Sequence, residues 1–161
     1  MKPVIERIYS VVLTLLVGAQ AAVGYLVAPT LFEVIADRSH AGSIAGVIFE
    51  RMGWISLAGY LLLLGLRLNM DRSGLNPARW PSRIILVALG FTALGHGVIR
   101  PWIVTVRTSI QQSGGFEACD PAMRAQFGML HGASSLLFLA VFILGLSLVL
   151  RLTEKNLVRE Q

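Results

Sequence analysis

Four apolar stretches, each long enough to cross a bilayer, take up most of this 161-residue chain. They cover approximately residues 5–28, 44–66, 84–106 and 127–150. A helix needs about 20 residues to cross about 30 Å of hydrocarbon, and lipid offers no hydrogen bonds to an unpaired backbone. The sequence therefore predicts an all-α integral membrane fold, an up-down bundle of four helices with short loops. Because these loops leave no room for a soluble domain, we expect a single domain spanning residues 1–161.

Charge is scarce, and it is unevenly distributed along the chain. Only 14% of the residues are charged, and 55% are hydrophobic, whereas a soluble domain carries about 25% charged residues. Nine lysines and arginines fall on the side of the two termini and the loop between spans two and three, against five on the other side. The positive-inside rule then predicts cytoplasmic termini. The net charge of +5 thus indicates orientation and contact with anionic lipid, and we expect no nucleic-acid partner.

The N-terminal segment resembles a secretory signal peptide, with Ala19-Gln20-Ala21 as a possible cleavage site. Two features oppose cleavage. The apolar run continues to Ala28, and Glu6 interrupts the basic leader. We therefore expect an uncleaved first span that Pro29 ends, followed by a short interfacial helix within residues 30–40.

Small residues recur on the faces of the second and fourth spans. Gly42, Gly46 and Gly53 share one face of span two, and Ser39 is the expected N-cap of that helix. Glycines let membrane helices approach closely, so we expect these residues to mark helix-packing faces. The same role is predicted for Gly128 and Gly132 in span four.

A few polar residues interrupt the spans, and each is costly there. A charged side chain at mid-bilayer costs about 2.5 to 3.5 kcal/mol on insertion scales. The up-down topology brings these residues to the outer half of the membrane, so we predict one intramembrane cluster. Its candidate members are Gln20, Glu50, His96, Arg100, His131 and Ser135.

Within this cluster, Glu50 is expected to pair with Arg100 or His96, because Glu50 shares the glycine face of its helix. Gln20 and Ser135 are predicted as further hydrogen-bonding partners. Arg51 points about 100° away from Glu50 and is expected to extend toward the membrane surface. Such polar groups can also serve only to lock helices together, at roughly 0.6 kcal/mol per hydrogen bond.

No spacing typical of a metal or catalytic site occurs in the chain. His-x-x-x-His, Cys-x-x-Cys, His-Glu-x-x-His and phosphate-binding glycine loops are all missing from the sequence. We therefore assign no catalytic residue, no metal ligand and no cofactor, while a haem or metal stays open.

Three segments resemble one known family. They are GYLVAPTLF at residues 24–32, AGSIAG at residues 41–46 and FGMLHGASS at residues 127–135. In this order and spacing they resemble the bacterial domain of unknown function 4149 family, which is similar to the transmembrane protein 205-like proteins. The resemblance implies a four-helix protein of the bacterial inner membrane with no assigned biochemical role. A more distant likeness is to copper-resistance D and HemJ-type bundles. Those present a histidine in their first helix, and the first span here has none.

Three functions remain open at this point. The leading hypothesis is a non-enzymatic scaffold or partner subunit whose glycine faces contact another membrane protein or a second copy. The alternative is binding or transport of a small ligand, a metal or a haem in the outer-half cluster. The third is a HemJ-like membrane oxidoreductase.

Overall fold

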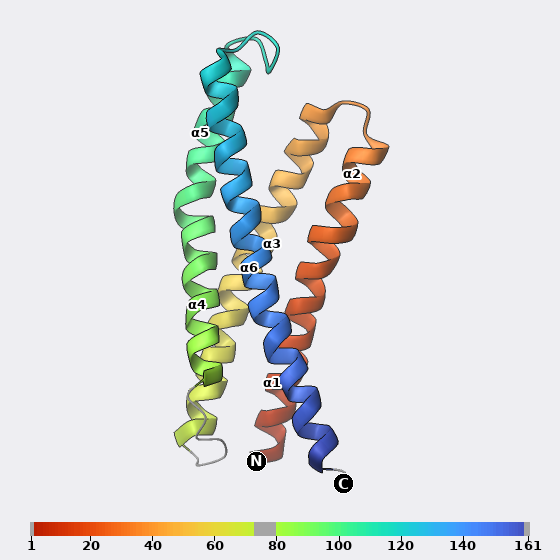
Figure 1. Cartoon of the computed structure of the whole chain (residues 1–161), viewed down its shortest axis with the longest axis vertical. Coiled ribbons are helices and arrows are strands. Elements are labelled where there is room, and N and C mark those ends of the chain that lie inside the picture. The colour runs from red at the N-terminus through yellow and green to blue at the C-terminus, as the bar shows by residue number, and fades with distance from the viewer. Residues whose placement is uncertain (1, 73–79, 160–161) are drawn as a thin grey trace.

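The computed structural model describes the backbone of residues 2–72 and 80–159, and the side chains of residues 4–70 and 80–152. The described residues form helices and no strands, which confirms the all-α fold. Four helical rods run alternately up and down, and both termini lie at one end of the bundle (Figure 1). We name this the terminal end, and the opposite end the distal end.

Two of the four rods are continuous α-helices and two contain a π-helical segment. The first rod joins α1 (Lys2–Ala21), η1 (Ala22–Val27) and α2 (Ala28–Val34); the second is α3 (Arg38–Arg72); the third joins α4 (Trp80–Leu94), η2 (Gly95–Ile99) and α5 (Arg100–Gln112); the fourth is α6 (Pro121–Arg159). Four helices within these rods are long and apolar enough to cross a membrane, so the chain is a multi-pass membrane protein.

Each π-helical segment ends two residues before a proline, Pro29 in the first rod and Pro101 in the third. Proline lacks an N–H donor, and its ring clashes with the carbonyl group four residues earlier. The wider π turn relieves both problems, because the N–H of Ala28 donates to Val23 and that of Arg100 donates to Gly95, five residues back. The first rod therefore continues through Pro29, and does not end there as the sequence suggested.

The short connection before α3 also differs from expectation. The predicted interfacial helix is instead α2, which continues the first rod as far as Val34. The carboxylate of Asp37 accepts hydrogen bonds from the backbone N–H groups of Ser39 and His40. Asp37 is therefore the N-cap of α3, in place of the predicted Ser39.

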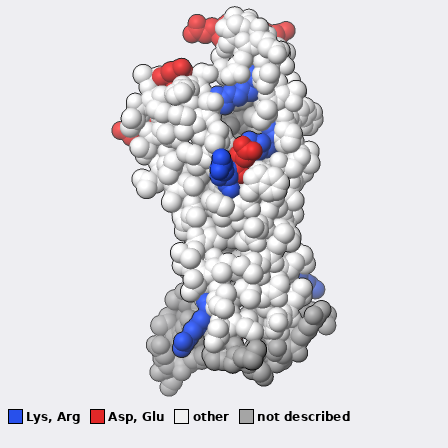
Figure 2. Space-filling model, turned by 180° about the vertical axis from the view of Figure 1, so that it is seen from behind, with Lys and Arg blue, Asp and Glu red and all other residues white. Residues whose placement is uncertain are grey.

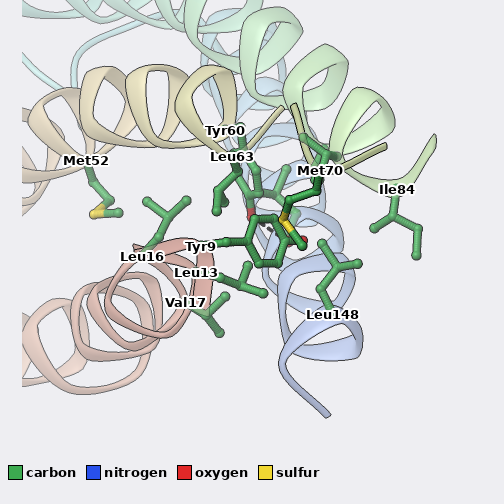
Figure 3. Packing of buried hydrophobic residues seen from close by; sticks show 13 residues of the cluster. Tyr9, Leu13, Leu16, Val17, Met52, Tyr60, Leu63, Met70, Ile84 and Leu148 are labelled. Carbon is green, nitrogen blue, oxygen red and sulfur yellow. Dashed lines mark hydrogen bonds between the residues drawn. The ribbon is translucent and has the colours of Figure 1, made fainter. Parts of the chain in front are cut away.

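The apolar core lies toward the terminal end. Buried side chains from α1, α3, α4 and α6 meet there around Leu13, Tyr60 and Leu63 (Figure 3). Within it, the side-chain nitrogen of Gln20 donates to the hydroxyl of Ser56 at 3.2 Å. The Tyr60 hydroxyl lies 3.3 Å from the carbonyl oxygen of Val141. These polar contacts join three rods within the core.

The distal half is organised differently, as two arms. One arm is α2 with the start of α3, and the other is α5 with the start of α6; they diverge in Figure 1. A small apolar cluster, centred on Val106 and Ile110, lies within the second arm alone. Among the described residues, the backbone of α5 does not pack against that of α2 or α3. The two arms therefore share no apolar core, and side chains must join them.

Candidate functional site

An ion pair joins the second and third rods where the two arms begin to diverge. A guanidinium nitrogen of Arg100, at the start of α5, lies 2.5 Å from a carboxylate oxygen of Glu50 in α3. The two side chains stay 31% and 36% exposed, respectively. The predicted pairing of Glu50 with Arg100 is thus present, and both groups can be reached from outside the bundle.

His96 lies one turn before Arg100 and packs against α3. Its ring meets the edge of Trp54, with ring centroids 4.5 Å apart. The imidazole also occupies the space beside Gly53, because a Cβ atom added there would overlap the ring. Gly53 therefore leaves room for the imidazole of His96, which is a side chain and not a helix backbone.

Arg107 makes a second connection between the arms, seven residues beyond Arg100. Its guanidinium donates to the carbonyl oxygens of Gly42 at 3.1 Å and Ser39 at 2.8 Å. Cβ positions at Gly42 and Gly46 lie 3.8–3.9 Å from its nitrogens. The predicted glycine face thus makes room for an arginine of the same chain.

Sequence reasoning missed Arg107. The signal was available, because residues seven apart lie on nearly the same face of a helix. Arg107 therefore had to face the same neighbour as Arg100.

Positive charge exceeds negative charge at this site. Three arginines lie near Glu50: Arg100 pairs with it, Arg51 follows it in sequence, and Arg107 contacts Gly42 about two turns earlier on the same helix. Figure 2 shows acidic and basic groups gathered in the distal half of one face, beside an uncharged stretch of surface. We name Glu50, Arg51, Arg100 and Arg107 the distal charged cluster. Its formal charge is +2, and only Arg100 has a carboxylate partner among the described residues.

The depth of this cluster follows from helix geometry. Sixteen residues of α3 separate Arg51 from Arg67, and seventeen residues of the third rod separate Arg83 from Arg100. At 1.5 Å per residue, both intervals are about 25 Å, slightly less than the roughly 30 Å of bilayer hydrocarbon. When Arg67 and Arg83 lie at one hydrocarbon boundary, the Glu50–Arg100 pair therefore lies just inside the other boundary, and Arg107, about 10 Å farther along its helix, lies just beyond it.

The structure does not bring every predicted member to this cluster. Gln20 is buried in the apolar core and bonds Ser56 there, because it shares its helix face with Leu13, Leu16 and Val17. It therefore lies on the terminal side of the Glu50–Arg100 pair.

His131 and Ser135 of α6 are both exposed, and the Ser135 hydroxyl donates to the carbonyl of His131 in its own helix. The His131 ring stacks on Phe127 with centroids 6.0 Å apart. The neighbouring Leu130 is buried and takes the inward position, which turns His131 away from the bundle. A functional role for Gln20, His131 or Ser135 stays a prediction.

Gly128 and Gly132 likewise lie on the outside of α6. No atom lies within 4 Å of a Cβ position at either glycine. Their predicted packing role therefore has no partner within the described part of this chain.

No metal site can be built from the residues that the structure describes, since no three His, Cys, Asp or Glu side chains among them lie close enough to hold an ion. The arrangement can instead hold an anion. Guanidinium groups form paired, charge-assisted hydrogen bonds with carboxylates and phosphates.

A family model described as a domain of unknown function (DUF4149) matches residues 11–112. No curated protein and no solved structure matches the chain.

A charge exchange tests the ion pair. Glu50→Arg alone places two cations together and Arg100→Glu alone places two anions together, so each should lower the unfolding temperature in detergent. The double variant restores the pair in reverse and should recover much of the loss. We expect a coupling free energy of about 0.5–1 kcal/mol, at the low end because the groups are partly exposed. If the destabilisation of the double variant equals the sum of the two single-variant losses, the pairing is contradicted.

Proposed function

Because the chain belongs to the DUF4149 family, whose description assigns no function, we propose a function from the distal charged cluster: the protein binds a small acidic ligand between its two distal arms. The observation that carries this proposal is the surplus of arginine over carboxylate at a partly exposed site in the distal half of the bundle. Charge inside a membrane is costly and is usually compensated, so a cluster with formal charge +2 favours an anionic partner.

The arrangement of hydrogen bonds supports the same proposal. Arg107 is held by two neutral carbonyl oxygens, so its positive charge is uncompensated within the described residues. Arg51 is exposed beside Glu50. An acid placed here could accept hydrogen bonds from Arg107 or from Arg51 without breaking the Glu50–Arg100 pair.

The charge distribution supports an orientation as well. The terminal end has the larger share of lysine and arginine, which favours cytoplasmic termini under the positive-inside rule. The distal charged cluster would then face the outer leaflet of a bacterial inner membrane, and its ligand would arrive from the outer side.

A second candidate is the scaffold or partner-subunit role, and the α6 surface favours it. Gly128 and Gly132 have no neighbouring atom within 4 Å, and Met129 and Leu136 beside them are 70% and 68% exposed. Small residues flanked by exposed apolar side chains are typical of surfaces at which membrane helices associate. No feature of the described residues favours the redox role.

The binding proposal predicts stabilisation by acids. We expect one or more of citrate, inorganic phosphate, dodecanoate and phosphatidylglycerol to raise the unfolding temperature of the detergent-purified protein saturably. A ligand at 100 times its Kd adds about 2.7 kcal/mol to the free energy of unfolding. Arg107→Gln should weaken the effect, and Arg83→Gln, an exposed arginine at the terminal end, should not. The proposal fails if no acid stabilises the protein, or if the acids stabilise Arg107→Gln as much as they stabilise the wild type.

The scaffold candidate predicts a change of assembly state. Replacing Gly128 and Gly132 together by Ile fills the open surface of α6 and should shift the mass of the protein in mild detergent, measured by light scattering. The matched control is Gly90→Ile, because no atom lies within 4 Å of a Cβ there either. An unchanged mass for the double variant would argue against association through this face.

A further inference from the structure

We propose that the acidic ligand of the distal charged cluster is an anionic membrane phospholipid, whose phosphate lies at the arginines and whose acyl chain follows α3 toward the terminal end. This inference rests on the proposed binding function and names its ligand class. It commits to a lipid headgroup as the source of the phosphate, in preference to a phosphate taken from solution.

Depth is the first argument. Arg51 and Arg100 lie about 25 Å from the arginines of the terminal end and Arg107 about 10 Å farther, so the cluster straddles one boundary of the hydrocarbon. The polar headgroups of membrane lipids begin at this boundary. A lipid therefore brings its phosphate to the depth of these guanidinium groups by lateral diffusion, with its acyl chains already in the hydrocarbon.

The surface next to the cluster is the second argument. Trp54 follows Glu50 by four residues and Leu61 follows by eleven, so the three side chains share one face of α3. Trp54 is 60% exposed and Leu61 is 56% exposed. Trp54 is also supported from behind by the ring of His96. Trp54 and Leu61 thus present exposed apolar surface on this face, from about one turn below Glu50 to about 17 Å along the helix.

Charge complementarity is the third argument, and it selects among lipids. The cluster carries a formal charge of +2, from three arginines and one carboxylate. A zwitterionic lipid brings its own amine, which compensates its phosphate. An anionic lipid brings a phosphate without an amine, and guanidinium groups form paired, charge-assisted hydrogen bonds with phosphate in either leaflet. The guanidinium fork also matches phosphate oxygens better than a lysine does.

The test uses Trp54 as a reporter in the full-length protein. In a Trp80→Phe, Trp102→Phe background, Trp54 is the only tryptophan. The protein is reconstituted in vesicles of phosphatidylcholine containing a fixed fraction of brominated phosphatidylglycerol or brominated phosphatidylcholine, and quenching of Trp54 fluorescence reports lipid occupancy. We expect phosphatidylglycerol to associate at least about fivefold more strongly than phosphatidylcholine, the effect of one basic residue near an anionic group.

Two variants test whether the arginines of the cluster cause the preference for phosphatidylglycerol. Arg51→Gln leaves the Glu50–Arg100 pair intact and should reduce the preference for phosphatidylglycerol, and Arg107→Gln should reduce it as well. Arg83→Gln, at the terminal end, should leave it unchanged. Circular dichroism of each variant verifies that the helices remain folded.

Three outcomes decide the inference. Equal quenching by the two brominated lipids overturns it, as does a preference that survives both variants at the cluster. Relief of the preference by millimolar inorganic phosphate also overturns it, because the site then takes phosphate from solution. If citrate or phosphate stabilises the protein while neither lipid is preferred, the proposed binding function survives and only the lipid assignment fails.

Discussion

Hydrocarbon cannot solvate a charge or an open backbone hydrogen bond, and this constraint accounts for most of what the chain does. It makes each of the four apolar stretches a helix. It also requires every polar group within them to find a partner or to reach a boundary. Glu50 and Arg100 pair across two rods, and their spacing from Arg67 and Arg83 corresponds to nearly the thickness of the hydrocarbon. The remaining arginines of the distal charged cluster reach the edge of the hydrocarbon without a carboxylate of their own.

The two halves of the bundle are consequently built on different interactions. The terminal half has a continuous apolar core, reinforced by the hydrogen bonds of Gln20 and Tyr60. The distal half divides into two arms, which the Glu50–Arg100 pair and the hydrogen bonds of Arg107 connect. The π turns before Pro29 and Pro101 lie in this same half. A ligand that competes for the arginines would therefore act on the contacts that join the arms.

The sequence was sufficient for the fold and for part of the site. Apolar runs of bilayer length predict membrane helices reliably, and the shared glycine face of α3 correctly predicted that Glu50 would face a neighbouring rod. Rotational position was harder to predict. His131 and Leu130 are adjacent in sequence, and only the packing of α6 determined which of them faces inward.

Proline was misjudged for a related reason. A proline usually ends a helix in water, but within a membrane the helix continues when a π turn can satisfy the backbone, as it does before Pro29. Arg107 was overlooked because it lies just past the predicted end of the third span, where an arginine is expected to reach the membrane surface. Its contact with Gly42 depends on how the two arms lie relative to each other, which the sequence does not give.

The depth of the distal charged cluster is the central claim, and nitroxide accessibility measures it directly. In a Cys119→Ser background, spin labels are placed at Val47→Cys, one turn distal to Glu50, and at Leu62→Cys, three turns to its terminal side; both native side chains are exposed. The account predicts that a nickel chelate in water relaxes the label at position 47 strongly, whereas oxygen dominates at position 62. Equal, oxygen-dominated relaxation at both positions would place the cluster deep in hydrocarbon and contradict the account.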